Sequence, residues 1–71
     1  MAHKTYKERL ILSRPDHPGD GVWRAYFRVT WHDENGIHSH EFLDTGIVFN
    51  TEEAAIAYGF AVAHSWIDEE V

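Results

Sequence analysis

Five side chains that could contact a ligand recur at every second position in the middle of the chain. They are Arg24, Tyr26, Arg28, Thr30 and His32. Because successive side chains of a β-strand point to opposite faces, this spacing places all five on one face of a strand. Cations with an aromatic ring between them can hold phosphates and stack a nucleobase. The stripe therefore predicts a contact surface, for nucleic acid or for an acidic segment of another protein.

The same arginines have a purely structural alternative. Arg24 and Arg28 could pair across strands with Glu41 or Asp44, each pair contributing about 0.2–1 kcal/mol. The net charge of −6 would also repel a polyanion at long range. Whether these arginines contact a ligand or only pair across strands depends on whether their guanidinium groups are free.

Three histidines surround an expected turn and could form a metal site. His38 and His40 are two residues apart, so they share one face of a strand, a spacing that two zinc ligands can use. A three-residue turn over 34–36 would place His32 opposite His38 and complete the cluster. A two-residue turn at Asn35-Gly36 would instead bring Asp33 opposite His38. The register stays open, and solvated histidines are the simpler expectation.

Residues for catalysis are absent from the sequence. There is no cysteine, no glycine-rich phosphate loop and no Gly-x-Ser-x-Gly motif. A domain this small also has little room for a pocket of about 300–1,000 Å³. We therefore expect no enzymatic activity and no cofactor.

The strands that position these side chains follow from hydrophobic alternation. We expect a first strand over 4–13, a proline- and glycine-rich loop over 14–21, and a second strand over 22–33. Asn35-Gly36 favours a hairpin, because both residues accept positive φ. A third strand is expected over about 37–49.

A helix is expected from Asn50 or Thr51 to the end of the chain. Asn50 as N-cap would place Glu53 at the third helical position, a variant of the capping box. The stripe facing the sheet is predicted to comprise Ala55, Ile56, Gly59, Val62, Ala63, Trp66 and Ile67. Gly59 costs about 1 kcal/mol against alanine in a helix, so a packing reason is expected for it. Three acids, Asp68, Glu69 and Glu70, lie where the helix dipole prefers cations. We expect them to pair with Lys4, Lys7 or Arg9 of the first strand, or else the last turn frays.

Composition predicts one domain over 1–71 with an uneven distribution of charge. Residues 1–28 hold all six basic residues and three acids, whereas residues 29–71 hold nine acids and no lysine or arginine. No apolar run approaches the roughly 20 residues that span a bilayer, and no secretory segment is visible, so we expect a cytoplasmic protein without membrane contact. Self-association has two possible routes: the outer helix face, where Ala57, Ala61 and His64 lie between Tyr58 and Phe60, and pairing of one subunit's basic strands with another's acidic helix. The alternative is that the alanines are simply good helix formers.

Over the whole chain, the sequence resembles small uncharacterised bacterial proteins. These share a helix that starts Thr51-Glu52-Glu53-Ala54, a stripe of alanine and glycine, and an ending similar to Trp66-Ile67-Asp68. The resemblance implies a β-β-β-α fold and brings no activity with it.

A shorter stretch resembles the DNA-binding domain of plant ethylene-response factors and its relatives at the N-termini of phage-type integrases. The residues from Gly21 to Arg28 look like that family's middle strand, and those from Phe49 to Tyr58 look like its helix entry. In that family the exposed sheet face reads DNA, so the resemblance implies this role for Arg24, Tyr26 and Arg28.

Together these patterns predict an α+β fold in which a three-stranded antiparallel sheet packs against one C-terminal helix. The expected core is Leu10, Leu12, Trp23, Phe27, Val29, Trp31, Ile47, Phe49, Ile56, Val62 and Trp66. The expected function is that of a small non-enzymatic binding or interaction module that uses the exposed sheet face, with nucleic-acid binding as the alternative.

Overall fold

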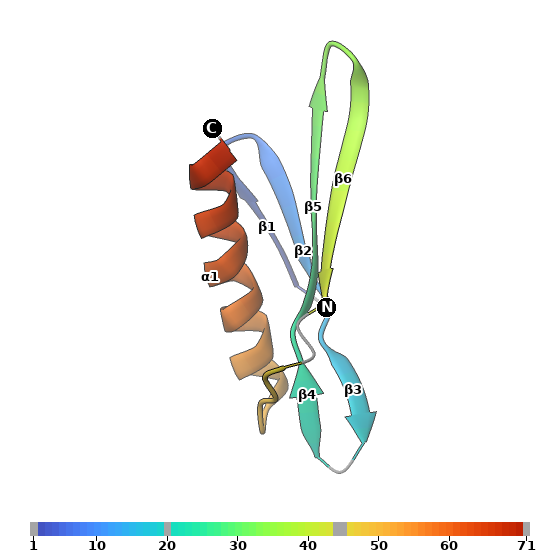
Figure 1. The fold of residues 1–71 in the computed structure, drawn as a ribbon, viewed down its shortest axis with the longest axis vertical. Helices are drawn as coiled ribbons and strands as arrows, with labels where there is room; N and C mark the ends of the chain where they lie inside the picture. Colours follow the sequence, from blue (N-terminus) through green and yellow to red (C-terminus); the bar gives the residue numbers. More distant parts are fainter. Residues whose placement is uncertain (1, 20, 44–45, 71) are drawn as a thin grey trace.

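The computed structural model, which describes residues 2–19, 21–43 and 46–70, is an antiparallel sheet covered on one face by a helix (Figure 1). The main sheet has the strand order β1-β2-β5-β6, and β3 and β4 form a separate hairpin. The strands are β1 (Ala2–Tyr6), β2 (Arg9–Ser13), β3 (Asp16–Gly19), β4 (Val22–Arg24), β5 (Tyr26–Asp33) and β6 (Gly36–Leu43), followed by α1 (Glu52–Glu70). The predicted α+β class, with an antiparallel sheet against one C-terminal helix, is confirmed.

The main sheet has four strands where three were predicted, because residues 4–13 are not one strand. A tight turn at Lys7 and Glu8 divides them into β1 and β2, which pair with each other. Both turn residues have positive φ, 50° and 65°, the conformation that a two-residue hairpin turn matched to strand twist requires. Glycine and asparagine usually mark such turns. The Lys-Glu pair gives no such signal, so the hairpin was missed.

The turn also sets which side of β2 faces the helix. Ile11 is completely buried, whereas Leu10, predicted to lie in the core, is 40% exposed on the opposite face. Leu12 shares that opposite face and is half-buried. Side chains alternate along a strand, so an error of one residue in the alternation assigned Leu10 and Leu12 to the core and Ile11 to the opposite face.

The alternation predicted for residues 22–33 is confirmed, although the strand is divided at Ala25. Phe27 and Val29 are buried under the helix together with Ala25, and Tyr26 and Arg28 lie on the other face. Trp23 belongs to β4 and forms an isolated bridge with Phe49, which brings the chain back to the β3–β4 hairpin before α1. The predicted third strand ends at Leu43, so Ile47, also expected in the core, is 41% exposed.

The turn between β5 and β6 follows neither predicted register. Asp33 pairs with Gly36, so the loop is Glu34-Asn35, and Gly36 has a φ of 120°. The backbone N–H of Asn35 donates to Asp33 Oδ1 at 2.8 Å, which closes an Asx turn. This hydrogen bond, followed by one to His38, lowers the pKa of Asp33.

Helix α1 packs through its smallest residues. Ala55, Gly59, Ala63 and Ile67 are buried and recur every fourth residue, while Ile56, Val62 and Trp66 are half-buried beside them, so the predicted stripe is confirmed. The cap is Thr51 rather than Asn50, because Thr51 Oγ1 accepts the Ala54 N–H at 3.1 Å. No helix among the described residues is long and apolar enough to cross a membrane.

Gly59 has the packing reason that its position predicted. A Cβ atom at Gly59 would lie 3.0 Å from Ser13 Oγ and 3.3 Å from Phe27 Cδ1. Ser13 is completely buried, and its hydroxyl has no hydrogen-bond partner among the described residues. The helix therefore approaches the sheet so closely at Gly59 that a Cβ atom there would require Ser13 or Phe27 to shift by a few tenths of an ångström.

We predict that Gly59→Ala lowers the free energy of unfolding by about 1 kcal/mol, because overpacking of about 1–3 kcal/mol exceeds the gain in helix propensity. Ser13→Ala should be neutral or stabilising, since it removes an unsatisfied buried hydroxyl. It should also reduce the cost of Gly59→Ala. Denaturant unfolding of a double-mutant cycle measures this coupling. A stabilising Gly59→Ala in the parent protein would contradict the close approach.

The acidic end of α1 is paired rather than frayed. Asp68 Oδ1 accepts a hydrogen bond from the Tyr6 hydroxyl at 2.8 Å and forms an ion pair with Lys7 Nζ at 2.7 Å. The contact with Lys7 lowers the pKa of Asp68 most, below its ordinary 3.8, and the hydrogen bond from Tyr6 lowers it further. The contact with Asp68 in turn raises the pKa of Lys7 above its ordinary 10.5. The β1–β2 turn is thus fastened to the last turn of the helix.

We predict that Asp68→Asn lowers the Tm modestly at neutral pH. A lowered carboxyl pKa stabilises the fold above its unfolded value and ceases to do so as the pH falls through the folded pKa. The raised Lys7 pKa acts in the opposite sense, so its contribution is lost as the pH rises above about 10.5. The Tm difference between the parent and Asp68→Asn should therefore vanish at both extremes. Glu69→Gln is the matched control, and an equal loss in that variant would contradict the pairing.

Candidate functional site

The sheet face turned away from α1, here called the open face, carries four of the five predicted contact residues. The registers place on it Leu10, Leu12, Tyr26, Arg28, Thr30, His32, Ile37, Ser39, Glu41 and Leu43. Ile37 is 76% exposed and Leu43 is 47% exposed. The face therefore combines exposed apolar side chains with a polar centre.

Four of the five predicted contact residues lie together on the open face, and the fifth does not. Tyr26, Arg28, Thr30 and His32 follow one another along β5. Arg24 lies in β4, in the separate hairpin, and turns toward β3. The break at Ala25 separates it from the stripe.

Arg28 and Tyr26 share one carboxylate across the strand pair. Arg28 Nη2 lies 2.8 Å from Glu41 Oε1, and the Tyr26 hydroxyl donates to Glu41 Oε2 at 2.6 Å. The tyrosine hydrogen bond, and then the arginine charge, lower the pKa of Glu41. The same hydrogen bond raises the pKa of Tyr26. Arg28 is therefore neutralised by the predicted partner Glu41, while Asp44 lies outside the described residues.

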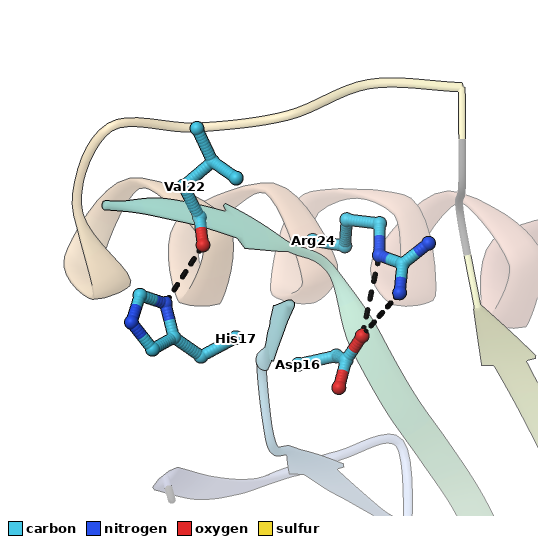
Figure 2. A network of polar contacts seen from close by, with 4 residues as sticks. All are labelled: Asp16, His17, Val22 and Arg24. Carbon is cyan, nitrogen blue, oxygen red and sulfur yellow. Dashed lines mark hydrogen bonds and ion pairs between the residues drawn. The ribbon is translucent and has the colours of Figure 1, made fainter. Parts of the chain in front are cut away.

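Arg24 is also neutralised, within the small hairpin (Figure 2). Its Nη2 and Nε both donate to Asp16 Oδ2, at 2.6 and 3.2 Å. His17 Nδ1 lies 2.8 Å from the Val22 carbonyl oxygen. Because that oxygen can only accept, Nδ1 carries the proton. The His17 ring stacks on Trp23 with centroids 4.1 Å apart. These contacts all lie within the β3–β4 hairpin and hold its two strands together.

A cavity of about 460 Å³ lies where the hairpin meets the open face. It is lined by Leu12, Arg14, Pro15, Asp16, His17, Tyr26 and Arg28. Its volume falls in the range of about 300–1,000 Å³ that is typical of ligand sites, so the expectation that so small a domain lacks room for one is wrong. Tyr26 and Arg28 were predicted. Leu12 was expected in the core, and the remaining lining residues were missed, because a loop rich in proline gave no sign of a strand.

Arg14 differs from the other two arginines of this region. It is exposed, and its guanidinium forms no ion pair within the described ranges. Its backbone N–H donates to the Tyr26 carbonyl oxygen at 2.8 Å, which fixes the Arg14 backbone beside β5. The cavity thus has one uncompensated cation at its wall.

The cluster of His32, His38 and His40, which depended on a three-residue turn, does not form. His32 lies on the open face opposite Ile37, whereas His38 and His40 lie on the helix face opposite Trp31 and Val29. The loop Glu34-Asn35 causes this, because its length places residues 32 and 38 on opposite faces. His38 binds Asp33 Oδ1 at 3.0 Å. Among the described residues no group of three His, Cys, Asp or Glu could hold a metal ion.

The helix face predicted for self-association is only partly free. Ala57 and Ala61 are exposed, as expected. His64 is half-buried against the Tyr6 ring, with centroids 4.3 Å apart, and its Nε2 is buried. The exposed strip is therefore narrower than predicted.

No protein-family model, curated protein or solved structure matches this chain. The resemblances to the bacterial proteins and to the ethylene-response-factor domain stay predictions.

We predict that Tyr26 titrates above its ordinary pKa of 10.0, because its hydroxyl donates to the carboxylate of Glu41. In Glu41→Gln the negative acceptor is lost, so the pKa of Tyr26 should fall toward 10.0. Titration of the Tyr26 ring signals by NMR measures this. Glu34→Gln makes the same charge change at the hairpin tip and should leave Tyr26 unaffected. An ordinary Tyr26 pKa in the parent protein would contradict the hydrogen bond.

Proposed function

We propose that this chain is a small non-enzymatic binding module that recognises an acidic segment of another protein on its open face. The observation that carries the proposal is the cavity beside Tyr26 and Arg28, with the unpaired Arg14 at its wall. A carboxylate is the complement of an uncompensated guanidinium, which can bind it through two parallel hydrogen bonds.

Charge in and around the cavity favours a small number of acidic groups. Arg28 is compensated by Glu41, and Arg24 by Asp16. A partner carboxylate at Arg14 adds an ion pair without breaking either of these. It can also approach Arg28, which is exposed on the same wall.

Apolar groups beside the cavity favour a protein partner. Leu12 and Pro15 contribute to the lining, and Leu10 and Leu43 are 40% and 47% exposed on the same face. Tyrosine and arginine are enriched among the residues that dominate binding energies at protein interfaces. An acidic segment that also carries leucine or a similar residue matches both features.

Nucleic-acid binding receives less support from the same contacts. Phosphate binding depends on several cations that release counterions, and two of the three arginines here are compensated by carboxylates. The net charge of −6 adds a repulsive field. Tyr26 remains a ring on which a base could stack, so the experiment includes nucleic acid.

We predict that a hexapeptide of alternating acidic and leucine residues shifts the NMR signals of Arg14, Tyr26 and Arg28, whereas its Asn/Gln counterpart does not. Arg14→Gln should weaken binding about tenfold or more, because a hydrogen bond to a charged group contributes about 1.5–3 kcal/mol. Lys4→Gln removes the same charge from the helix face, so it is the matched control and should bind as the parent does.

Two results would contradict this proposal. One is the absence of shifts on the open face at millimolar peptide, and the other is equal binding by Arg14→Gln and the parent. Short DNA duplexes and single-stranded RNA are titrated in parallel at low salt. If these bind instead, with an affinity that falls steeply as salt rises, the nucleic-acid alternative replaces the protein partner.

A further inference from the structure

Strand β6 forms an unprotected edge of the main sheet. It pairs with β5 through eight consecutive residues without a bulge, and no described strand pairs with its other side (Figure 1). Lysine, proline and bulges are the usual means of preventing edge strands from pairing with other chains. β6 (Gly36–Leu43) contains neither lysine nor proline, and Glu41 is its only charged residue apart from its histidines.

The opposite edge of the sheet is better protected. β1 (Ala2–Tyr6) has five residues and carries Lys4, and Tyr6 at its end is bound to Asp68 of the helix. A second strand added there would meet a cation and the helix terminus. Of the two edges, β6 is the one suited to pairing.

The apolar residues of β6 are placed symmetrically about its centre. Ile37 and Leu43 lie on the open face, are 76% and 47% exposed, and are each three residues from His40. An antiparallel copy of β6 centred on His40 would bring each of these two side chains opposite the other in the second copy.

We infer that this protein forms a homodimer through antiparallel pairing of β6 with β6 of a second copy, about a two-fold axis at His40. In this register Ile37 lies opposite Leu43 of the partner subunit, and Ser39 lies opposite Glu41 of the partner subunit. Paired residues of antiparallel strands share one face, so both helices lie on the same side of a continuous eight-stranded sheet. The inference does not rest on the proposed function.

Other registers match the surface less well. A shift by one residue would oppose Ile37 to the helix-face residue Phe42 and place the two helices on opposite sides of the joined sheet. A shift by two residues keeps the helices together but separates Ile37 from the partner's Leu43. Only the register centred on His40 covers both exposed apolar side chains.

Charge allows this pairing at physiological ionic strength. Glu41 is neutralised by Arg28 on the neighbouring strand, so it does not confront another acid across the joined edge. Each copy still carries a net charge of −6, and the copies repel each other at low salt. Measurements are therefore made at about 0.15 M salt, where the Debye length is about 8 Å.

The test is light scattering during size exclusion over a range of protein concentrations. The parent should show a concentration-dependent dimer of the 8.2 kDa chain. Ile37→Lys should raise the dimer dissociation constant about tenfold, because each copy loses an apolar pair and gains an edge lysine. Val48→Lys alters a side chain that is 55% exposed outside the strands, so it is the matched control and should leave the dimer intact.

Two further variants separate this interface from the alternatives. Ala61→Lys would disrupt pairing through the outer helix face, and Leu10→Lys would disrupt stacking of two open faces. Neither should affect a dimer joined through β6. A monomer at every concentration overturns the inference, as does a dimer that survives Ile37→Lys or dissociates in either of these two variants.

Cysteine cross-linking tests the register independently of affinity, because the chain has no cysteine of its own. Directly opposed Cα atoms lie about 4.5–5.5 Å apart, within disulfide range, whereas diagonal neighbours lie about 7–8 Å apart. His40→Cys should therefore oxidise rapidly to a covalent dimer, and Ser39→Cys should do so slowly. Faster cross-linking by Ser39→Cys, or none by His40→Cys, would overturn the proposed register.

Discussion

The close approach of α1 to the sheet at Gly59 is the constraint on which the rest of the structure depends. Ser13 and Phe27 lie so close that a Cβ atom there would require one of them to shift, so the helix axis is held close over β2 and β5. Ala55 and Ala63, one turn on either side, continue the same narrow contact. With the centre so close, larger side chains can pack only at the flanks of the helix. This geometry determines which sheet face is covered and which is left open.

The aromatic side chains around Trp66 close the space on one flank of this contact. Trp66 lies 5.7 Å from Trp31 and stacks on His40 at 5.2 Å, measured between ring centroids. The Arg9 guanidinium lies over the Trp31 ring at 4.5 Å and reaches Trp66 as well. Such a cation stabilises the aromatic faces without a carboxylate partner. Arg9 is therefore used inside the fold, whereas Arg14 forms no ion pair with any residue that the structure describes.

The parts of the fold that could be predicted were those with a regular period. The alternation along β5 and the small-residue stripe of α1 each repeat often enough to fix a face, and both were correct. The turn at Lys7 and Glu8 could not be predicted, because its left-handed backbone is imposed by strand pairing and not by residues that prefer it. Because this turn was not predicted, the wrong face of β2 was assigned to the core, and Ile11, which is buried, was left out of the predicted core. Tyr26 and Arg28 were predicted from the two-residue alternation of the strand. The cavity beside them depends on how the loop over 14–21 folds back, and no repeating pattern in the sequence reports that.

The small size of the core explains why so much apolar surface stays exposed. A chain of 71 residues buries only about 60% of the surface that its unfolded form exposes. Within the described part of the chain a single helix covers one face of the sheet, and the fully buried large apolar side chains are few: Phe27, Ile11, Ile67 and Val29. No cysteine is present to compensate through a disulfide. Burial of Leu10, Ile37 or Leu43 against a second chain would add apolar contact that the fold cannot provide internally, so binding and stability are expected to be linked. A partner that occupies the open face or the β6 edge should therefore also raise the free energy of unfolding.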